Sequence, residues 1–223
     1  MKKLLLLFLA AGMPALCIRS EDVRRLNASA DVFSEVMQTS DKSIPQDLLD
    51  KAQCAIIIPS MKKGAFIIGG KYGRGFVSCR KQGNVGWSAP AGVKVEGGSF
   101  GFQIGGSETD VIMLVMNEAG MKRLLTSKFT LGADASVAAG PVGRTSTAET
   151  DALMTAEILS WSRSRGVFAG ISLQGATLRP DIDSNEGLYG AKKENREILL
   201  GDTPVPESAA KLIGLLNKYS SRK

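Results

Sequence analysis

Apolar and polar residues recur along this chain with two periods, one helical and one typical of strands. In residues 21–38 (EDVRRLNASADVFSEVMQ), apolar residues return every three or four positions opposite charged ones, which predicts an amphipathic helix. Ser20 precedes two acids and is the expected N-cap of this helix. A second, short helix is predicted over residues 44–52, which carry a proline near their start.

From Cys54 onward the apolar runs are shorter, and turns rich in glycine and lysine separate them. This rhythm is typical of a β-meander with short connections. The predicted strands span residues 55–58, 65–70, 76–80, 85–89, 93–95, 100–104, 110–116, 129–142, 148–163 and 167–173. Further helices are predicted at 117–127, with Asn117 as N-cap, at 184–189 and at 206–219.

Two stretches, residues 128–143 and 160–175, consist largely of alanine, glycine, serine and short apolar residues. Small side chains let strands approach closely and curve. The 223 residues include 25 glycines, are 43% apolar and only 6% aromatic, which favours one strand-rich domain over a helix bundle. We therefore predict an α+β fold with a strongly curved, mostly antiparallel β-sheet or barrel-like core and N-terminal, central and C-terminal helices.

The first residues have the pattern of a signal peptide. Two lysines precede the apolar run LLLLFLAAGMPAL, which is shorter than the ~20 residues of a membrane-spanning helix. We expect residues 1–17 to be a signal peptide and residues 18–223 a single domain, exported to the periplasm or the extracellular space. The alternative is a lipoprotein anchored through Cys17, although the PAL sequence before this cysteine fits a lipoprotein poorly.

Basic residues are concentrated in one part of the chain. The net charge is +6, and eight of the basic residues lie between positions 51 and 95, where there is no acid. Such an asymmetry attracts phosphate-bearing surfaces. Lysines also keep the edges of sheets soluble, and the sequence leaves both interpretations open.

The side chains of common catalytic and metal sites are missing. The chain has no histidine, which excludes Ser-His-Asp triads and histidine zinc sites. Residues 64–71 (GAFIIGGK) resemble a P-loop, but the lysine comes one residue late and Tyr72 replaces the required Ser or Thr. Residues 181–186 have a superficial likeness to a calcium loop but lack the central glycine and the distal glutamate of an EF-hand, and they are expected to form a helix cap and a turn. We predict no enzyme activity, no metal and no cofactor.

Cys54 and Cys79 are the two cysteines beyond the leader. The predicted meander places them on strands that flank an intervening one. Two strand spacings separate them by about 10 Å, which is too far for a disulfide. We expect free, buried thiols.

Several motifs occur in an order that resembles the SYLF domain family, a lipid-binding module of eukaryotes and bacteria. The motifs are residues 52–59 (AQCAIIIP), 69–75 (GGKYGRG), 87–90 (WSAP), 109–117 (TDVIMLVMN), 128–143, 162–175 and 187–190 (GLYG). The chain is similar to a bacterial, signal-peptide-bearing member over roughly residues 27–216. The resemblance implies binding of phosphoinositide or other anionic phospholipid headgroups, with an N-terminal amphipathic helix that assists insertion. Eukaryotic members of the family usually carry a Src-homology-3 domain beyond this module, and the printed sequence departs from that pattern by ending at Lys223.

We expect basic turns to contact the headgroups. The candidate lipid-binding residues are Lys62, Lys63, Lys71, Arg74, Arg163, Arg165 and Trp161. The first four are predicted on turns where backbone amides also approach phosphate. The last three adjoin a turn at Gly166, where the tryptophan ring is expected to pack at the membrane interface. Exposed turns also carry Lys and Arg without any ligand.

The sequence thus predicts an exported module that binds anionic phospholipid at an envelope membrane. The alternative is a structural or adhesive module that binds a protein partner through an exposed apolar patch. Export removes the chain from nucleic acid and from cytoplasmic actin, so neither is an expected partner. Whether the helix at 21–38 packs on the domain or inserts into the membrane stays open.

Overall fold

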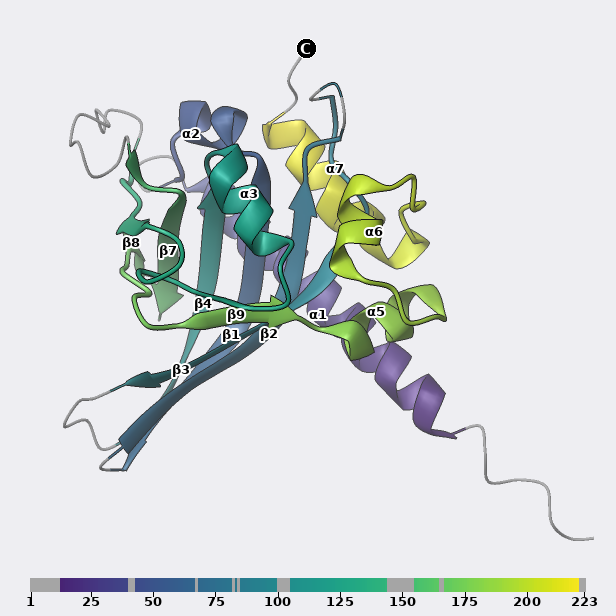
Figure 1. The fold of residues 1–223 in the computed structure, drawn as a ribbon, viewed down its shortest axis with the longest axis horizontal. Helices are drawn as coiled ribbons and strands as arrows, with labels where there is room; N and C mark the ends of the chain where they lie inside the picture. The colour runs from purple at the N-terminus through teal and green to yellow at the C-terminus, as the bar shows by residue number, and fades with distance from the viewer. Residues whose placement is uncertain are drawn as a thin grey trace, which may run out of the picture.

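The protein is built around one strongly curled sheet that forms a half-barrel, with helices packed on both of its faces (Figure 1). The computed structural model describes residues 13–39, 43–66, 68–81, 83, 85–99, 105–143, 155–164 and 167–220. The predicted α+β fold with a curved, mostly antiparallel sheet is confirmed.

The sheet has nine strands in the order β5-β9-β3-β2-β1-β4-β7-β6, with β8 paired to β7. Their bounds are β1 Cys54–Phe66, β2 Ile68–Cys79, β3 Ala91–Ser99, β4 Gly105–Val115, β5 Phe129–Thr130, β6 Val137–Ala139, β7 Ile158–Ser164, β8 Val167–Gly170 and β9 Thr177–Pro180. Every neighbouring pair is antiparallel except β6 and β7, which are parallel. The sheet is therefore mixed at one edge.

The helices occupy the two ends of the chain and the connections between strands. They are α1 Met13–Gln38, α2 Gln46–Lys51, α3 Glu118–Leu124, α5 Ile182–Tyr189, α6 Asn195–Leu200, the 3-10 helix η1 Glu207–Ala209 and α7 Ala210–Tyr219. Two of the predicted caps are confirmed: the Asn117 side chain accepts from the Gly120 amide, and that of Asp181 accepts from the Ser184 amide. Among the residues described, no helix is both long and apolar enough to cross a membrane.

Each central strand supplies two hydrophobic cores, because successive side chains of a strand point to opposite faces. In β1, Ala55 and Ile57 pack into the core beneath α1 and α7. Ile56 and Ile58 pack into the second core, together with residues of α3 and α6. The unbroken apolar run of β1 is explained by this burial on both faces.

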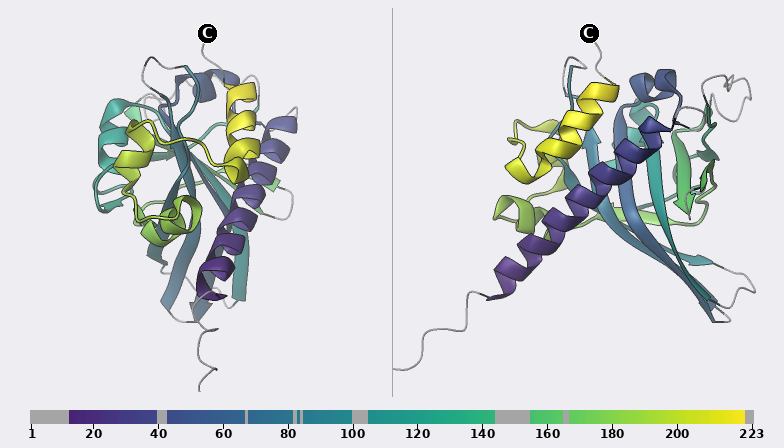
Figure 2. Two further views of the ribbon diagram at one scale, coloured as in Figure 1. Left: turned by 90° about the vertical axis from the view of Figure 1, so that its right-hand side faces the viewer. Right: turned by 180° about the vertical axis from the view of Figure 1, so that it is seen from behind.

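Helix α1 crosses one face of the sheet beside α7 (Figure 2). It begins at Met13, so the N-cap predicted at Ser20 is wrong, because seven residues before Ser20 continue the helix. Leu26, Phe33 and Val36 on its apolar stripe are buried, and Phe33 meets the Tyr219 ring edge-on. Of the two alternatives for residues 21–38, the structure shows packing on the domain.

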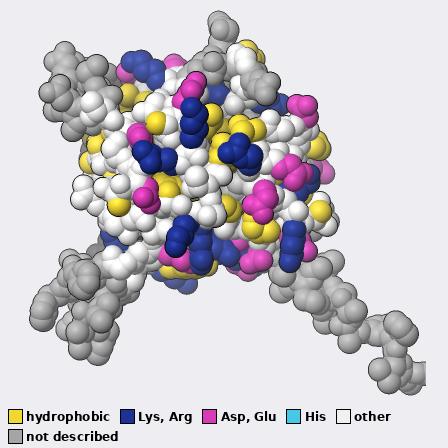
Figure 3. All heavy atoms as spheres, viewed as in Figure 1, with side chains coloured by type: hydrophobic (Ala, Val, Ile, Leu, Met, Phe, Trp, Pro, Cys, Tyr) yellow, Lys and Arg dark blue, Asp and Glu magenta, His cyan; other side chains and the backbone are white. Residues whose placement is uncertain are grey.

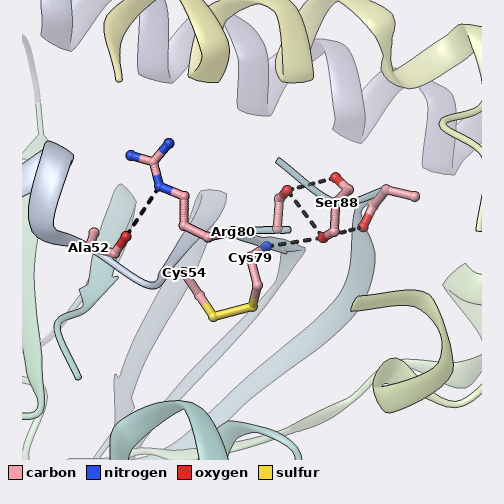
Figure 4. The surroundings of a disulfide bond; sticks show 7 residues. Ala52, Cys54, Cys79, Arg80 and Ser88 are labelled. Carbon is pink, nitrogen blue, oxygen red and sulfur yellow. Dashed lines mark hydrogen bonds between the residues drawn. A yellow bond between two sulfur atoms is a disulfide. The ribbon is translucent and has the colours of Figure 1, made fainter. Parts of the chain in front are cut away.

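Cys54 and Cys79 form a disulfide, so the prediction of free thiols is wrong (Figure 4). They are register partners at one end of the β1–β2 hairpin, with Cα atoms 3.9 Å apart. Pro59 and Ser60 suggested a turn, but β1 continues past them through a bulge. The predicted strands 55–58 and 65–70 thus belong to one long hairpin, and no strand lies between the cysteines.

Small residues allow close contacts where the sheet curls. A Cβ atom on Gly140 would lie 2.0 Å from the Trp161 ring, and one on Gly170 would lie 2.2 Å from the Gly140 carbonyl oxygen. Real Cβ atoms do not approach so closely, so a side chain at either position would force strands apart. The expectation that small side chains permit close, curved packing is confirmed here. The predicted strand 100–104 and residues 148–154 of the predicted strand 148–163 lie outside the described residues.

Candidate functional site

The β1–β2 hairpin extends well beyond the helices, together with parts of β3 and β4 (Figure 1). We call residues 61–74 of this hairpin the arm. The end of the arm and the beginning of α1 point to the same side of the molecule in every view and diverge from each other (Figure 2). Basic side chains, with some acidic ones among them, lie along this side of the molecule, at the bottom of the view in Figure 3.

A pocket of about 420 Å³ lies where α1 passes the base of the arm. We call it the basic pocket. The charged and aromatic side chains that line it are Glu21, Arg24, Arg25, Lys62, Tyr72 and Arg74. Four cations therefore face one carboxylate, which is an arrangement suited to an anionic ligand.

A buried carboxylate holds one of the pocket's cations in place. Asp181, at the start of α5, is fully buried. The Arg74 Nε donates to its Oδ2 at 2.5 Å, and the Lys94 Nζ lies 3.1 Å from its Oδ1. Burial alone would raise the pKa of Asp181, but the hydrogen bonds and charges of Arg74 and Lys94 hold it below the ordinary value. Arg74 is therefore a fixed part of the pocket floor.

Arg25 is held from the other side by acids of its own helix. Its Nη1 donates to Asp22 at 2.6 Å and its Nη2 donates to Glu21 at 2.5 Å. The Ser184 hydroxyl joins the two carboxylate clusters, lying 2.8 Å from Asp22 Oδ1 and 3.1 Å from Asp181 Oδ2. This network connects α1 to α5 and β2 beneath the pocket.

Asp22 differs from Asp181 in how well its charge is compensated. Its Oδ2 is buried and has no hydrogen-bond partner among the described atoms. Burial raises the pKa of Asp22, and the contacts with Ser184 and Arg25 only partly offset that effect.

The rim of the basic pocket carries exposed cations. Arg24 and Lys62 are exposed, and neither forms an ion pair within the described part of the chain. Tyr72 is 46% exposed and is the register partner of Lys62. Glu108, an exposed acid on β4, pairs in register with Lys62 from the other side. At the rim, an incoming anion therefore meets two exposed cations, Arg24 and Lys62, that are in no ion pair within the described residues.

Of the predicted lipid-binding residues, four lie in the arm. Lys62 and Arg74 line the basic pocket, whereas Lys63 and Lys71 are register partners on the opposite face. All four lie on β1 and β2, so their placement on turns is wrong, because the hairpin is longer than predicted. Burial lowers the pKa of Lys63, and the Lys71 charge adds to this effect.

The other three predicted residues do not join this group. Arg163, on β7, is paired with Asp110 at 2.8 Å and also with Glu35. Trp161 is fully buried and its Nε1 donates to the Pro141 carbonyl. Its expected packing at a membrane interface is therefore wrong for this conformation, since the ring fills the space above Gly140. Arg165 lies outside the described residues.

Sequence reasoning missed Arg24, Arg25 and Tyr72 as members of the pocket. The two arginines were interpreted as the solvated face of an amphipathic helix. The sequence offers one signal for them: they follow two acids, Glu21 and Asp22, which can pair with one of the arginines. That they face β1 and β2 across the pocket depends on a long-range contact that no local pattern predicts.

Comparison with known families shows which family the chain belongs to. Residues 96–219 match the family described as "Ysc84: Las17-binding protein actin regulator". The chain belongs to this family. The predicted resemblance to SYLF domains is thereby confirmed, and the Ysc84 family is one of binding proteins rather than a known family of enzymes. Asp181 and Ser184 lie within the matched segment, whereas Arg24 and Lys62 precede it.

Several curated Ysc84-like proteins are similar to most of this chain. SH3 domain-containing YSC84-like protein 1 of Rattus norvegicus is 30% identical over 193 residues, which cover 85% of this chain and 56% of the relative. SH3 domain-containing protein PJ696.02 of Schizosaccharomyces pombe is 33% identical over a match that covers 83% of this chain and 44% of the relative. Protein YSC84 of Saccharomyces cerevisiae is 31% identical over a match that covers 79% of this chain and 38% of the relative. This chain thus spans about half the length of the curated relatives it matches, or less.

Proposed function

We propose that this chain is an exported module that binds the anionic headgroups of phospholipids at an envelope membrane. The observation that carries the proposal is the basic pocket, with exposed Arg24 and Lys62 above the fixed guanidinium groups of Arg25 and Arg74. Guanidinium and ammonium groups form strong, charge-assisted hydrogen bonds to phosphate oxygens. Any phosphate-bearing headgroup, a phosphoinositide included, offers this chemistry.

The shape of the molecule supports a membrane as the source of that phosphate. The arm and the part of α1 that follows the leader extend to the same side (Figure 2), and both contribute residues to the basic pocket. A flat anionic surface on that side contacts both projections at once.

Two features support export. The leader pattern of residues 1–17 directs a chain out of the cytosol, and the Cys54–Cys79 disulfide suits an oxidising compartment. The family description names Las17 and actin, but a chain outside the cytosol would not meet cytoplasmic actin. We therefore propose membrane lipid rather than actin as its ligand.

Removal of rim charges tests this function. Arg24→Gln and Lys62→Gln are each expected to weaken binding to anionic vesicles about fivefold, because one cation near such a surface contributes ~1 kcal/mol. Glu108→Gln removes the acid beside Lys62 and is expected to strengthen binding by a similar factor. Vesicle co-sedimentation at low salt gives the three affinities.

Lys122→Gln is the matched control, since Lys122 is an exposed cation of α3 with its side chain 76% accessible, away from the arm. It is expected to bind as the wild type does. Equal binding of the wild type to anionic and neutral vesicles, or equal losses from all three cation variants, would count against the proposed site.

A further inference from the structure

The bulge in β1 gives Ser60 an unfavourable backbone conformation. The register of β1 shifts against both neighbours, between Ile58 and Met61 on the β4 side and before Lys62 on the β2 side. Ser60 has a φ of 49°, and no other residue except glycine has a positive φ in the described part of the chain. Asparagine and aspartate enter this left-handed region more readily than serine does, and glycine enters it without strain. Strain of this kind is concentrated at ligand sites.

Two glycines of β2 make room for this bulge. A Cβ atom on Gly75 would lie 2.1 Å from the Ile57 carbonyl oxygen, and one on Gly73 would lie 2.6 Å from the Ile58 side chain. Neither glycine has a positive φ, so close approach of β1 explains them, and turn geometry does not. Glycine weakens the interior of a strand. The sheet therefore loses strand stability in order to accommodate the bulge.

The bulge determines which side chains of β1 face α1. Successive side chains of a strand alternate between its two faces, yet Ile58 and Met61, three positions apart, both pack into the second core. The extra residue therefore places Lys62 on the face toward α1, where it lines the basic pocket. Ser60 lines the same pocket and is exposed. Bulges beside functional sites commonly redirect a side chain in this way.

An acid on the neighbouring strand fixes the bulge. The Ser60 amide donates to Asp110 Oδ1 at 2.9 Å. The Arg163 Nε donates to Asp110 Oδ2 at 2.9 Å, and Arg163 also pairs with Glu35 of α1. The amide of Ser60 is thus occupied, whereas its hydroxyl forms no hydrogen bond within the described ranges. This hydroxyl is available to donate to a ligand oxygen in the pocket.

We infer that Ser60 is a further binding residue of the basic pocket, whose hydroxyl donates to a phosphate oxygen of the ligand beside Lys62. Asp110 is a positioning residue, because it holds the Ser60 backbone in the bulge. The inference rests on the proposed function and deepens it, because it names an uncharged donor for the phosphate group. Cations attract any anion, whereas a hydroxyl at a fixed place requires an acceptor oxygen within hydrogen-bond distance. That oxygen belongs to a lipid headgroup or to a free phosphate, and the test separates these two sources.

Ser60→Gly separates a role in binding from a role in stability. Glycine adopts a positive φ without strain, so the thermal midpoint is expected to stay equal or to rise. The affinity for phosphatidylglycerol vesicles and for inorganic pyrophosphate is expected to fall about fivefold, because one hydrogen bond to the phosphate is lost. Ser60→Asn tolerates the same backbone conformation and carries an amide donor. It is expected to recover most of the affinity that glycine loses.

Ser107→Gly is the matched control for this substitution. Ser107 is an exposed serine of β4 that pairs in register with Lys63, and it does not line the basic pocket. The variant is expected to bind both probes as the wild type does. An equal loss of affinity in Ser60→Gly and Ser107→Gly would contradict the assignment of Ser60.

Two substitutions of Asp110 test its positioning role. Asp110→Asn and Asp110→Ala remove the same charge, but only asparagine keeps an oxygen that accepts from the Ser60 amide. The alanine variant is expected to bind both probes about threefold more weakly than the asparagine variant. In the alanine background, Ser60→Gly is expected to have no further effect on affinity. General destabilisation would not produce this coupling, and a full loss from Ser60→Gly in that background would overturn the role of Asp110.

The two probes separate this inference from the proposed function. If the wild type binds vesicles and Ser60→Gly binds them equally well, the inference is overturned and the proposed function stands. If the wild type binds pyrophosphate but no vesicle, and Ser60→Gly weakens that binding, the inference stands for a free phosphate and the membrane function is overturned. If the wild type binds neither probe, both are overturned.

Discussion

Replacing Asp181 with asparagine is expected to lower the free energy of unfolding by about 3 kcal/mol. The carboxylate is fully buried and compensates both Arg74 and Lys94. Its isosteric amide leaves these cations without a counter-charge in a poorly solvated site. For a chain of this size the loss corresponds to a fall in the thermal midpoint of about 6–12 °C.

Asp22→Asn is the matched control in the same cluster. Burial raises the pKa of Asp22, so keeping this side chain ionised at pH 7 costs the folded state stability. The neutral amide avoids that cost and is expected to leave the stability at pH 7 unchanged or higher. For Asp181 the pH dependence is the opposite. Its pKa is lowered, so the ionised carboxylate stabilises the fold above the ordinary value of 3.8, and this stabilisation is lost as the pH falls below that value. Thermal melts of both variants at pH 7 and pH 3 check this. Equal destabilisation by the two substitutions at pH 7 would contradict the assignment of charges in the cluster.

Removal of the disulfide by Cys54→Ala with Cys79→Ala is expected to cost about 3.5 kcal/mol, for a bridge between residues with a sequence separation of 25. The bond restricts the unfolded chain and joins the two strands of the hairpin at the end opposite the arm's tip. Denaturant unfolding with and without reductant measures the effect. The reductant is expected to lower the wild-type midpoint and to leave the double variant unchanged.

Intact mass under non-reducing conditions is the direct check on this bond. The wild type is expected to be lighter by the hydrogens lost on oxidation. Two free thiols at Cys54 and Cys79, or a midpoint that ignores the reductant, would restore the earlier prediction and remove one argument for export.

The sheet was largely predictable because local patterns specify it. The change of period after Cys54 and the small residues around Gly140 indicate a curved, strand-rich fold, and the caps at Asn117 and Asp181 follow from side-chain chemistry. The length of β1 was not predictable, because Pro59 is a turn signal that a bulge absorbs. The wrong prediction for the cysteines followed from that one error.

The site was predictable only in part. An acid-free tract drew attention to Lys62 and Arg74, and both line the basic pocket. The other wall of the pocket is α1, and no local pattern says which strands a helix faces. The amphipathic ring of Trp161 suggested a place at the surface. The ring is buried because Gly140, which follows β6 and has no side chain, leaves room for it.

A positively charged, lipid-facing side formed by α1 and the hairpin is what the whole account requires. Hydrogen exchange of the wild type, with and without anionic vesicles, locates that side most directly. The account predicts added protection in residues 21–28 and 59–74 and none in α6 and α7. Protection confined to α6 and α7, or unchanged exchange in a vesicle-bound protein, would contradict it.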